Sequence, residues 1–83
     1  MTEEQKQETR IRIGHRIAAL RKLEGLTQEE LAIRAGLQRT HIGRIEAGRY
    51  AATIETIEAI AQAMGMTLDI IDPTLAGLAK INK

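Results

Sequence analysis

The sequence predicts an all-α domain, a bundle of four to five short helices that ends in a short C-terminal β-strand. Three observations support this fold class. The 83 residues include one tyrosine and neither phenylalanine nor tryptophan, whereas β-sheet domains favour aromatic and β-branched residues. The apolar residues stand among Glu, Lys, Gln and Arg, which are good helix formers. Glycines follow the predicted helices where a left-handed residue ends a helix, at Gly25, Gly36, Gly48 and Gly65.

The first predicted helix begins at a capping box formed by Thr2 and Gln5. In such a box each side chain can bond the other residue's backbone amide. The apolar face of this helix has spacings of four and three residues and comprises Ile13, Ile17 and Leu20. We divide the chain here into residues 1–10, an N-terminal extension of the helix, and residues 11–65, the main domain.

Two shorter helices are predicted next, at about residues 27–35 and 38–47. Thr27 and Glu30 form a capping box at the start of the first of them. Its buried face comprises Leu31, Ala32 and Ala35. Gly36 ends this helix at a position that suggests a positive φ angle, where a side chain would be strained.

A fourth helix follows Thr53, with an apolar face of Ile54, Ile57, Ala61 and Met64. Residues 66–72 are predicted to form a short strand, because apolar and polar residues alternate there. The remaining tail, residues 73–83, has two interpretations. It is disordered, or it starts a last helical turn at Asp72-Pro73, with one side formed by Leu75, Leu78 and Ile81.

The basic residues gather in the middle of the chain. The formal net charge is +1, but residues 10–50 carry nine Lys and Arg against four Glu, which gives +5. The rest carries three Lys against seven acidic residues, which gives −4. A basic segment is a candidate surface for a polyanion. Scattered solvated charge would give the same count, so the charge alone does not decide.

Several classes of function are disfavoured by what the sequence lacks. The chain has no cysteine, which excludes disulfides and thiolate metal sites. Its histidines, His15 and His41, have no metal-ligand spacing, and no phosphate loop or nucleophile motif is present. We therefore expect no enzyme, no metal and no cofactor. No apolar run approaches the ~18–20 residues that span a bilayer, and the N-terminus is not a signal peptide. We expect a cytoplasmic, nucleoid-associated protein without membrane contact.

The most informative segment runs from Leu26 to Gly48. It holds two short helices joined by a tight turn at Ala35-Gly36-Leu37, in which Leu37 can fill the angle between them. Helices joined by such a turn cross at about 90–120°, and the second can enter the major groove of DNA. The spacing and the basic charge together predict a helix-turn-helix.

A helical wheel of the second of these helices separates an inward face from an outward one. The inward face comprises Ile42, Ile45 and Glu46, and the outward face comprises Thr40, Gly43 and Arg44, flanked by Arg39 and His41. Arginine is the commonest specific partner of guanine in the major groove. Gly43 either keeps the helix close to the groove floor or is merely tolerated. An ordinary solvated helix would look similar, but the preceding helix-turn-helix spacing favours base reading.

The residues from Ile13 to Gly48, IGHRIAALRKLEGLTQEELAIRAGLQRTHIGRIEAG, are followed by an amphipathic segment, TIETIEAIAQAMG. Together they resemble the Cro/CI-type (XRE-like) helix-turn-helix family of phage repressors, plasmid regulators and bacterial antitoxins. The resemblance covers about Ile13 to Ile71 in length, order and spacing. It implies a lambda-repressor-like bundle and a transcriptional regulator, a repressor, that binds double-stranded DNA sequence-specifically.

The resemblance also implies residue roles. Base reading falls to Arg39, Thr40, His41 and Arg44. Contacts to the DNA backbone fall to Gln28, Gln38 and Arg49. A buried structural salt bridge joins Arg21 and Glu46, so Arg21 is not counted as a DNA contact.

Members of this family usually bind palindromic operators as two-fold dimers, with half-sites about one helical turn apart. The predicted strand would pair with its symmetry mate through Leu68 and Ile70, as a similarly placed strand does in HipB-like antitoxins. Alternatively, this segment packs on its own domain.

A second function remains open beside repression. An antitoxin of this family binds a toxin protein and also autoregulates its operon; co-purification with the product of a neighbouring gene would distinguish this role. RNA binding is less favoured, because the stacking aromatic residues of many RNA modules are missing.

Overall fold

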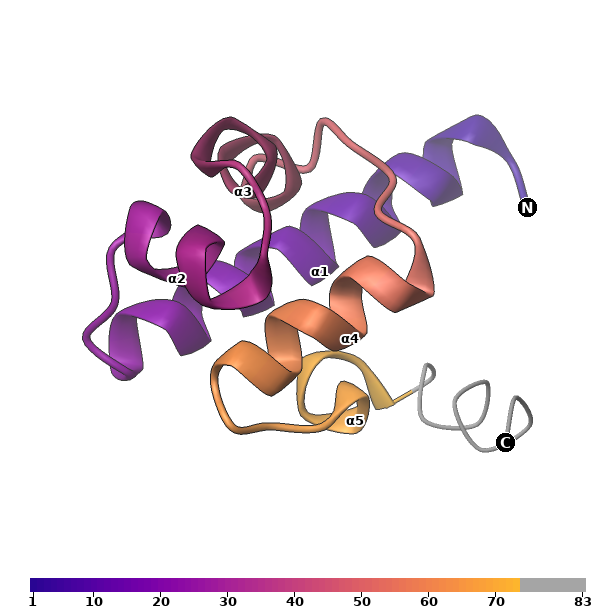
Figure 1. The fold of residues 1–83 in the computed structure, drawn as a ribbon. Coiled ribbons are helices and arrows are strands. Elements are labelled where there is room, and N and C mark those ends of the chain that lie inside the picture. The colour runs from indigo at the N-terminus through magenta and orange to yellow at the C-terminus, as the bar shows by residue number, and fades with distance from the viewer. Residues whose placement is uncertain (74–83) are drawn as a thin grey trace.

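A computed structural model, which describes residues 1–73, consists of five helices in that range. The long helix α1 (Glu3–Leu23) runs along the molecule. Figure 1 shows α2 (Gln28–Ala35) and α3 (Arg39–Glu46) on one side of it, and α4 (Ile54–Ala63) and α5 (Leu68–Ile71) on the other. The predicted all-α bundle is confirmed.

The core forms where the apolar faces of the helices meet. Helix α1 packs against α3 and α5, and α2 packs against α3 and α4. Burying a side chain such as Leu or Ile contributes roughly 1.5–3 kcal/mol, so these faces hold the short helices together. The largest fully buried side chains are Ile17, Leu31, Ile42, Ile45 and Ile60.

The helix starts are encoded locally, as the capping boxes predict. At α2 the Thr27 hydroxyl accepts from the Glu30 amide at 3.1 Å, and the Glu30 carboxylate accepts from the Thr27 amide at 2.9 Å. Thr2 and Gln5 form the same reciprocal pair at the start of α1. These bonds satisfy amides that have no partner within the helix.

The turn between α2 and α3 has the geometry that the sequence predicts. Gly36 has φ +71°, in the left-handed region, where glycine avoids the steric penalty of a side chain. The amide of Leu37 then donates to the carbonyl of Ala32 at 2.9 Å. The Leu37 side chain packs against the core, so this turn sets the direction in which α3 leaves α2.

Helices α1 and α3 approach each other at Gly14, which the sequence reasoning did not single out. A Cβ atom on Gly14 would lie 2.3 Å from the carbonyl oxygen of Ile45 and 2.8 Å from that of Glu46. Both neighbours are backbone atoms and cannot turn aside as a side chain would. Glycine is therefore required for α3 to lie this close to α1.

The predicted strand at residues 66–72 is wrong, because α5 occupies this segment. The amide of Asp72 donates to the carbonyl of Leu68 at 3.0 Å, which closes one helical turn. Leu68 and Ile71, three apart, are buried, whereas Ile70 is exposed. Periodicity over so few residues does not separate a strand from a helical turn.

The strand pairing was predicted to bring Leu68 and Ile70 into a dimer contact, and the helical turn places these two residues differently. Leu68 is 5% exposed and belongs to the core of its own domain, so it is not available to a symmetry mate. Helix α1 also satisfies polar groups here. Arg12 Nη2 donates to Asp72 Oδ2 at 2.7 Å, and Arg16 Nε donates to the Ile70 carbonyl at 2.9 Å. The alternative, in which the segment packs on its own domain, describes the structure.

The two interpretations of the predicted tail, residues 73–83, concern residues 74–83, which lie outside the part of the chain that the structure describes. The predicted boundary between residues 1–10 and the main domain does not interrupt a helix, since α1 continues through it.

Replacing Glu30 with glutamine should make the stability less dependent on acidic pH. The bond from the Thr27 amide, and then that with the Thr27 hydroxyl, lowers the pKa of Glu30. A carboxyl with a lowered folded-state pKa stabilises the protein above its unfolded pKa, about 4.3. That contribution is lost as the pH falls through the folded-state value.

Glutamine can keep the capping bond but does not titrate. Melting temperatures measured between about pH 5 and pH 3 should therefore fall less steeply for Glu30→Gln than for the original protein. Equal slopes would contradict a role of this carboxylate in acid stability.

Candidate nucleic-acid interface

Helix α3 carries its basic residues on the surface and its isoleucines inside. Ile42 and Ile45 are buried in the core, and they anchor the helix against α1 and α2. The exposed residues are the N-cap Gln38, the helical residues Arg39, Thr40 and Arg44, and Arg49 just beyond the helix. Of the residues predicted to touch DNA, these five are open to solvent.

A buried ion pair holds α3 against α1. Arg21 Nε donates to Glu46 Oε2 at 2.7 Å, and Arg21 Nη2 donates to Glu46 Oε1 at 3.0 Å. The bond to Glu46 raises the pKa of Arg21, against the opposing effect of burial. A third donor, Arg21 Nη1, bonds the Leu26 carbonyl at 2.8 Å. The structure thus brings together the two residues that the resemblance paired and ties them to the loop before α2.

Gln28 extends this network to the first turn of α2. Its Nε2 donates to Glu46 Oε1 at 3.0 Å, and the side chain is half-buried. Because a carboxylate only accepts, the amide must present its nitrogen to Glu46, and one of its two hydrogens remains for another acceptor. Gln28, which was predicted to contact the DNA backbone, therefore also links α2 to the end of α3.

The two helix starts of the motif differ in how they satisfy their amides. The cap of α2 is filled by Thr27 and Glu30. At α3, the N-cap residue Gln38 makes no side-chain cap bond. Unfilled amides at a helix N-terminus, with the helix dipole, suit an anion such as a phosphate. This is consistent with the role in DNA-backbone contact expected for Gln38.

His41 differs from the other predicted base-reading residues. It is half-buried, and its Nε2 atom is buried without a hydrogen-bond partner in the described part of the chain. Its ring packs edge-on against Tyr50, with the ring centroids 4.7 Å apart and the planes at 78°. His41 thus lies at the edge of the exposed face rather than extending from it.

Sequence reasoning missed the role of Tyr50. A hollow of about 330 Å³ on the surface of α3 is lined by Gln38, Thr40, His41, Arg44 and Tyr50. The signal available in the sequence was a lone aromatic residue four positions after the end of α3.

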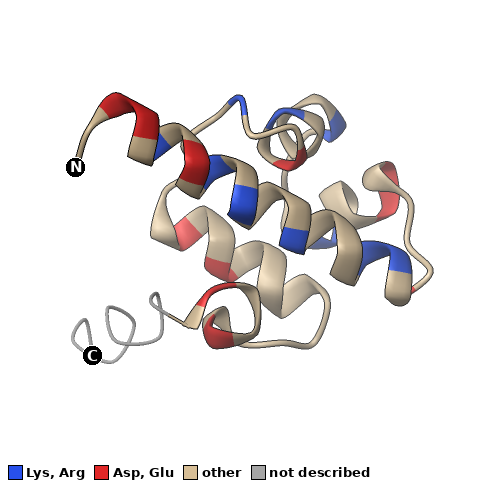
Figure 2. Ribbon diagram, turned by 180° about the vertical axis from the view of Figure 1, so that it is seen from behind, with Lys and Arg blue, Asp and Glu red and all other residues tan. Residues whose placement is uncertain are grey.

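Charge is distributed unevenly over the structure. Figure 2 shows Lys and Arg along α1 and on α3, whereas Asp and Glu lie on α4, on α5, at the starts of α1 and α2, and at the end of α3, where Glu46 pairs with Arg21. Two arginines of the basic segment, Arg12 and Arg16, bond to α5 and Asp72. The exposed arginines of α3 are therefore stronger evidence for a DNA surface than the net charge of residues 10–50.

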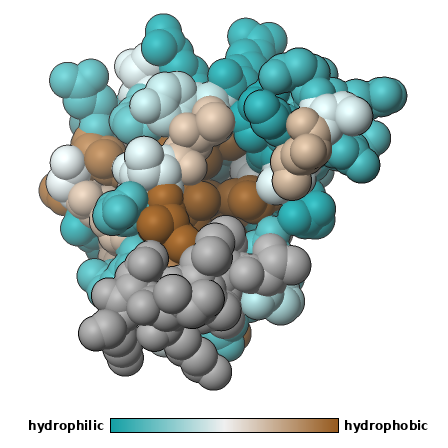
Figure 3. Space-filling view, turned by 90° about the vertical axis from the view of Figure 1, so that its right-hand side faces the viewer, coloured by the Kyte–Doolittle hydropathy of each residue, from teal (hydrophilic) through white to brown (hydrophobic). Residues whose placement is uncertain are grey.

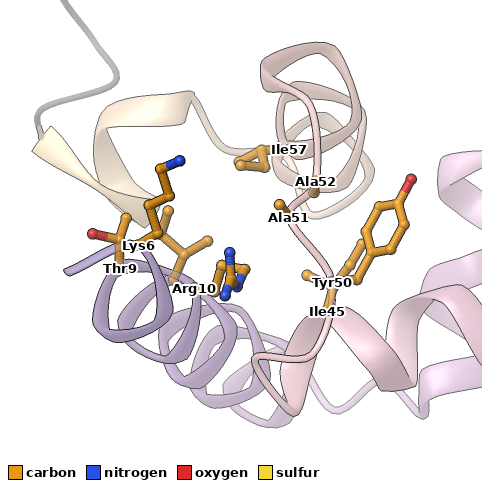
Figure 4. Close-up of a pocket in the computed structure, with 9 residues that line it drawn as sticks. Lys6, Thr9, Arg10, Ile45, Tyr50, Ala51, Ala52 and Ile57 are labelled. Atoms are coloured by element: carbon orange, nitrogen blue, oxygen red, sulfur yellow. The ribbon is translucent and has the colours of Figure 1, made fainter. Parts of the chain in front are cut away.

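An apolar groove opens at the end of the molecule where α1 begins. Figure 3 shows apolar side chains gathered in a hollow on this face, with hydrophilic side chains around them. The groove, about 220 Å³, is lined by Lys6, Thr9, Arg10, Ile13, Ile45, Tyr50, Ala51, Ala52 and Ile57. In Figure 4 the Tyr50 hydroxyl points away from Lys6 and Thr9. Tyr50 thus borders both this groove and the hollow beside α3.

Two helices joined by a tight glycine turn, with the second one basic and outward-facing, define a helix-turn-helix protein. A family model described as Helix-turn-helix (HTH_3) matches residues 17–71. The chain belongs to this family, whose members are transcriptional regulators that bind double-stranded DNA and are not enzymes. The predicted resemblance is confirmed.

Individual relatives agree with this assignment. The chain is 42% identical over 59 residues to the immunity repressor protein of Bacillus phage phi105, covering 71% of this chain and 41% of the repressor. It therefore spans about two fifths of that repressor's length. It is 36% identical over 63 residues to the HTH-type transcriptional regulator y4dJ of Sinorhizobium fredii, covering 75% of this chain and 82% of that protein.

A solved structure has the same arrangement of helices. The restriction-modification controller protein C.AhdI from Aeromonas hydrophila superposes with a TM-score of 0.75 at 30% identity, covering 77% of this chain and 97% of that one.

Within residues 1–73, none of the helices is both long and apolar enough to cross a membrane. The same residues contain no cluster of His, Asp and Glu able to hold a metal ion.

Proposed function

We propose that this protein is a sequence-specific repressor that binds a palindromic operator as a homodimer. The observation that carries the proposal is the exposure of Arg39, Thr40 and Arg44 on one surface of α3, while Ile42 and Ile45 anchor the opposite side. An anchored helix with exposed guanidinium groups can enter the major groove and bond guanine O6 and N7.

The surrounding residues support a defined docking position. Gln38, Arg49 and the free amide hydrogen of Gln28 can bind phosphates on either side of the reading residues. Phosphate contacts set the register of a protein on DNA, and base contacts set its sequence preference. The ion pair between Arg21 and Glu46 keeps α3 in one orientation, so both sets of contacts can form together.

Two copies of the chain are proposed because one recognition helix reads only a few base pairs. A two-fold dimer doubles the site, with half-sites about 34 Å apart. The similarity to an immunity repressor supports repression rather than activation. Leu68 is buried, so of the two residues predicted for the dimer contact only Ile70, which is 41% exposed, is open to a second copy.

Selection of bound duplexes from a random pool, at two salt concentrations, tests the proposal. A palindromic consensus is expected, with affinity that falls as salt releases counterions from the phosphates. Salt-dependent binding without any consensus would reduce the activity to nonspecific phosphate binding and would refute the proposal.

Arg44→Ala should weaken binding to the selected duplex by about 1–3 kcal/mol and relax the preference at one base pair of each half-site. The reason is the loss of a bidentate guanidinium contact to a base edge. Affinities measured by fluorescence anisotropy, together with a repeated selection, check both effects.

Arg34→Ala is the matched control, because Arg34 is an exposed arginine on α2 outside the proposed reading face. It removes the same charge and should leave every base preference in place. An Arg44→Ala protein with the original affinity and consensus would remove Arg44 from base reading.

A further inference from the structure

The ring of Tyr50 is held in place beside the recognition helix. Tyr50 is the only aromatic residue of Phe, Trp and Tyr type in the chain, and 44% of it is exposed. Its edge-on contact with His41, at 4.7 Å between centroids and 78° between planes, is a favoured geometry for ring pairs. An aromatic ring therefore stands at a fixed place next to α3, with part of its surface open.

The two rings form walls of the hollow on the surface of α3. Its other lining residues are Gln38, Thr40 and Arg44, so it includes side chains that face the DNA in the proposed function. A group of the duplex that enters this hollow would meet the two rings while Thr40 and Arg44 bond the neighbouring polar atoms.

His41 contributes the surface of its ring rather than a bond through Nε2. That nitrogen is buried and has no partner within residues 1–73, so a base edge cannot reach it. The wall that His41 and Tyr50 present together is chiefly ring surface. This ring wall differs from the side of the hollow that Arg44 lines, because a guanidinium group suits acceptor atoms and phosphates.

The major groove presents one apolar group that could fill a hollow with a ring wall. Its edges carry hydrogen-bond donors and acceptors, and thymine adds a 5-methyl group. We propose that Tyr50 and His41 form a slot that receives the 5-methyl group of one thymine in each half-site. The slot makes Tyr50 a specificity residue, and the inference rests on the proposed function, since it requires α3 to lie in the major groove.

Substituting deoxyuridine for thymidine tests the slot at the level of one methyl group. Each thymidine of the selected duplex is replaced in turn, and the affinity of the original protein is measured. One position in each half-site should lose roughly fourfold in affinity, the size expected for one buried methyl group. The other positions should lose less.

Variants of Tyr50 connect that loss to the ring. With Tyr50→Ala the thymidine and deoxyuridine duplexes should bind equally at the sensitive position, because the wall of the slot is gone. Tyr50→Phe, the matched control, should keep the difference, because the ring and not the hydroxyl forms the wall. Melting temperatures verify that both variants are folded. We expect them to fold, because Tyr50 is partly exposed.

The outcomes distinguish this inference from the proposed function. A consensus without a methyl-sensitive thymidine, measured on the original protein alone, overturns the slot. So does a Tyr50→Ala protein that still discriminates thymidine from deoxyuridine. A pool that yields no consensus refutes the proposed function itself, and the slot with it.

Discussion

Replacing Arg21 with alanine should destabilise the protein by about 3–5 kcal/mol, because it leaves the buried carboxylate of Glu46 without its cationic partner. The pair lies inside the protein, with side-chain exposures of 11% and 7%. In a domain of this size the melting temperature should fall by at least about 12 °C. Thermal unfolding followed by circular dichroism measures the change.

Lys22→Ala is the control, since Lys22 is the exposed neighbour of Arg21 on α1. Its melting temperature should stay close to that of the original protein. The melting temperature of Arg21→Lys should lie below that of the original protein, because an ammonium group cannot reproduce the bidentate bonds to Glu46. If the melting temperature of Arg21→Ala equals that of Lys22→Ala, the ion pair does not hold α3 in place.

Gly14→Ala should destabilise the protein by about 3 kcal/mol or more, at the upper end of what overpacking costs. The added Cβ would lie 2.3 Å from the Ile45 carbonyl oxygen, so α1 and α3 must move apart. This loss outweighs the roughly 0.5–1 kcal/mol that alanine gains over glycine inside a helix. Chemical denaturation measures the balance.

Gly43→Ala makes the same substitution in α3 and isolates the effect of the close approach. A Cβ on Gly43 would lie 3.8 Å from Gln28 Oε1, an ordinary contact. The free energy of unfolding should therefore rise or stay unchanged for Gly43→Ala, while it falls for Gly14→Ala. Equal effects at the two glycines would show that α1 and α3 can separate without cost.

Much of the fold follows from local signals. The capping boxes at Thr2 and Thr27 and the cap at Thr53 start helices where the structure has them. These signals work because they depend on residues within one turn of each other. The inward placement of Ile42 and Ile45 and the exposure of Arg44 follow from helical periodicity in the same way.

The strand prediction failed because its signal is not local. In the segment from Thr67 to Ile71 the choice between strand and helical turn depends on what lies beside it. The core accepts Leu68 and Ile71 together, and Arg16 bonds the Ile70 carbonyl. No pattern of five residues contains that information.

The candidate site likewise has residues that the sequence predicted and contacts that it did not. The exposed residues Arg39 and Arg44 were identified from helical spacing and from the family resemblance, and Gln38 from the resemblance alone. The contact of His41 with Tyr50 and the bond from Gln28 to Glu46 were not. These contacts join residues on different elements, whose meeting depends on how α3 leaves its turns.

The sequence by itself determined the first four helices and the helix-turn-helix, because caps, glycine turns and apolar periodicity act over a few residues. The tertiary structure alone decided that α5 is a helix, that Gly14 is needed where α1 meets α3, and that Tyr50 lines a hollow on the surface of α3. Those features arise only when distant segments pack, since burial and shared hydrogen bonds depend on neighbours that the chain brings together in space.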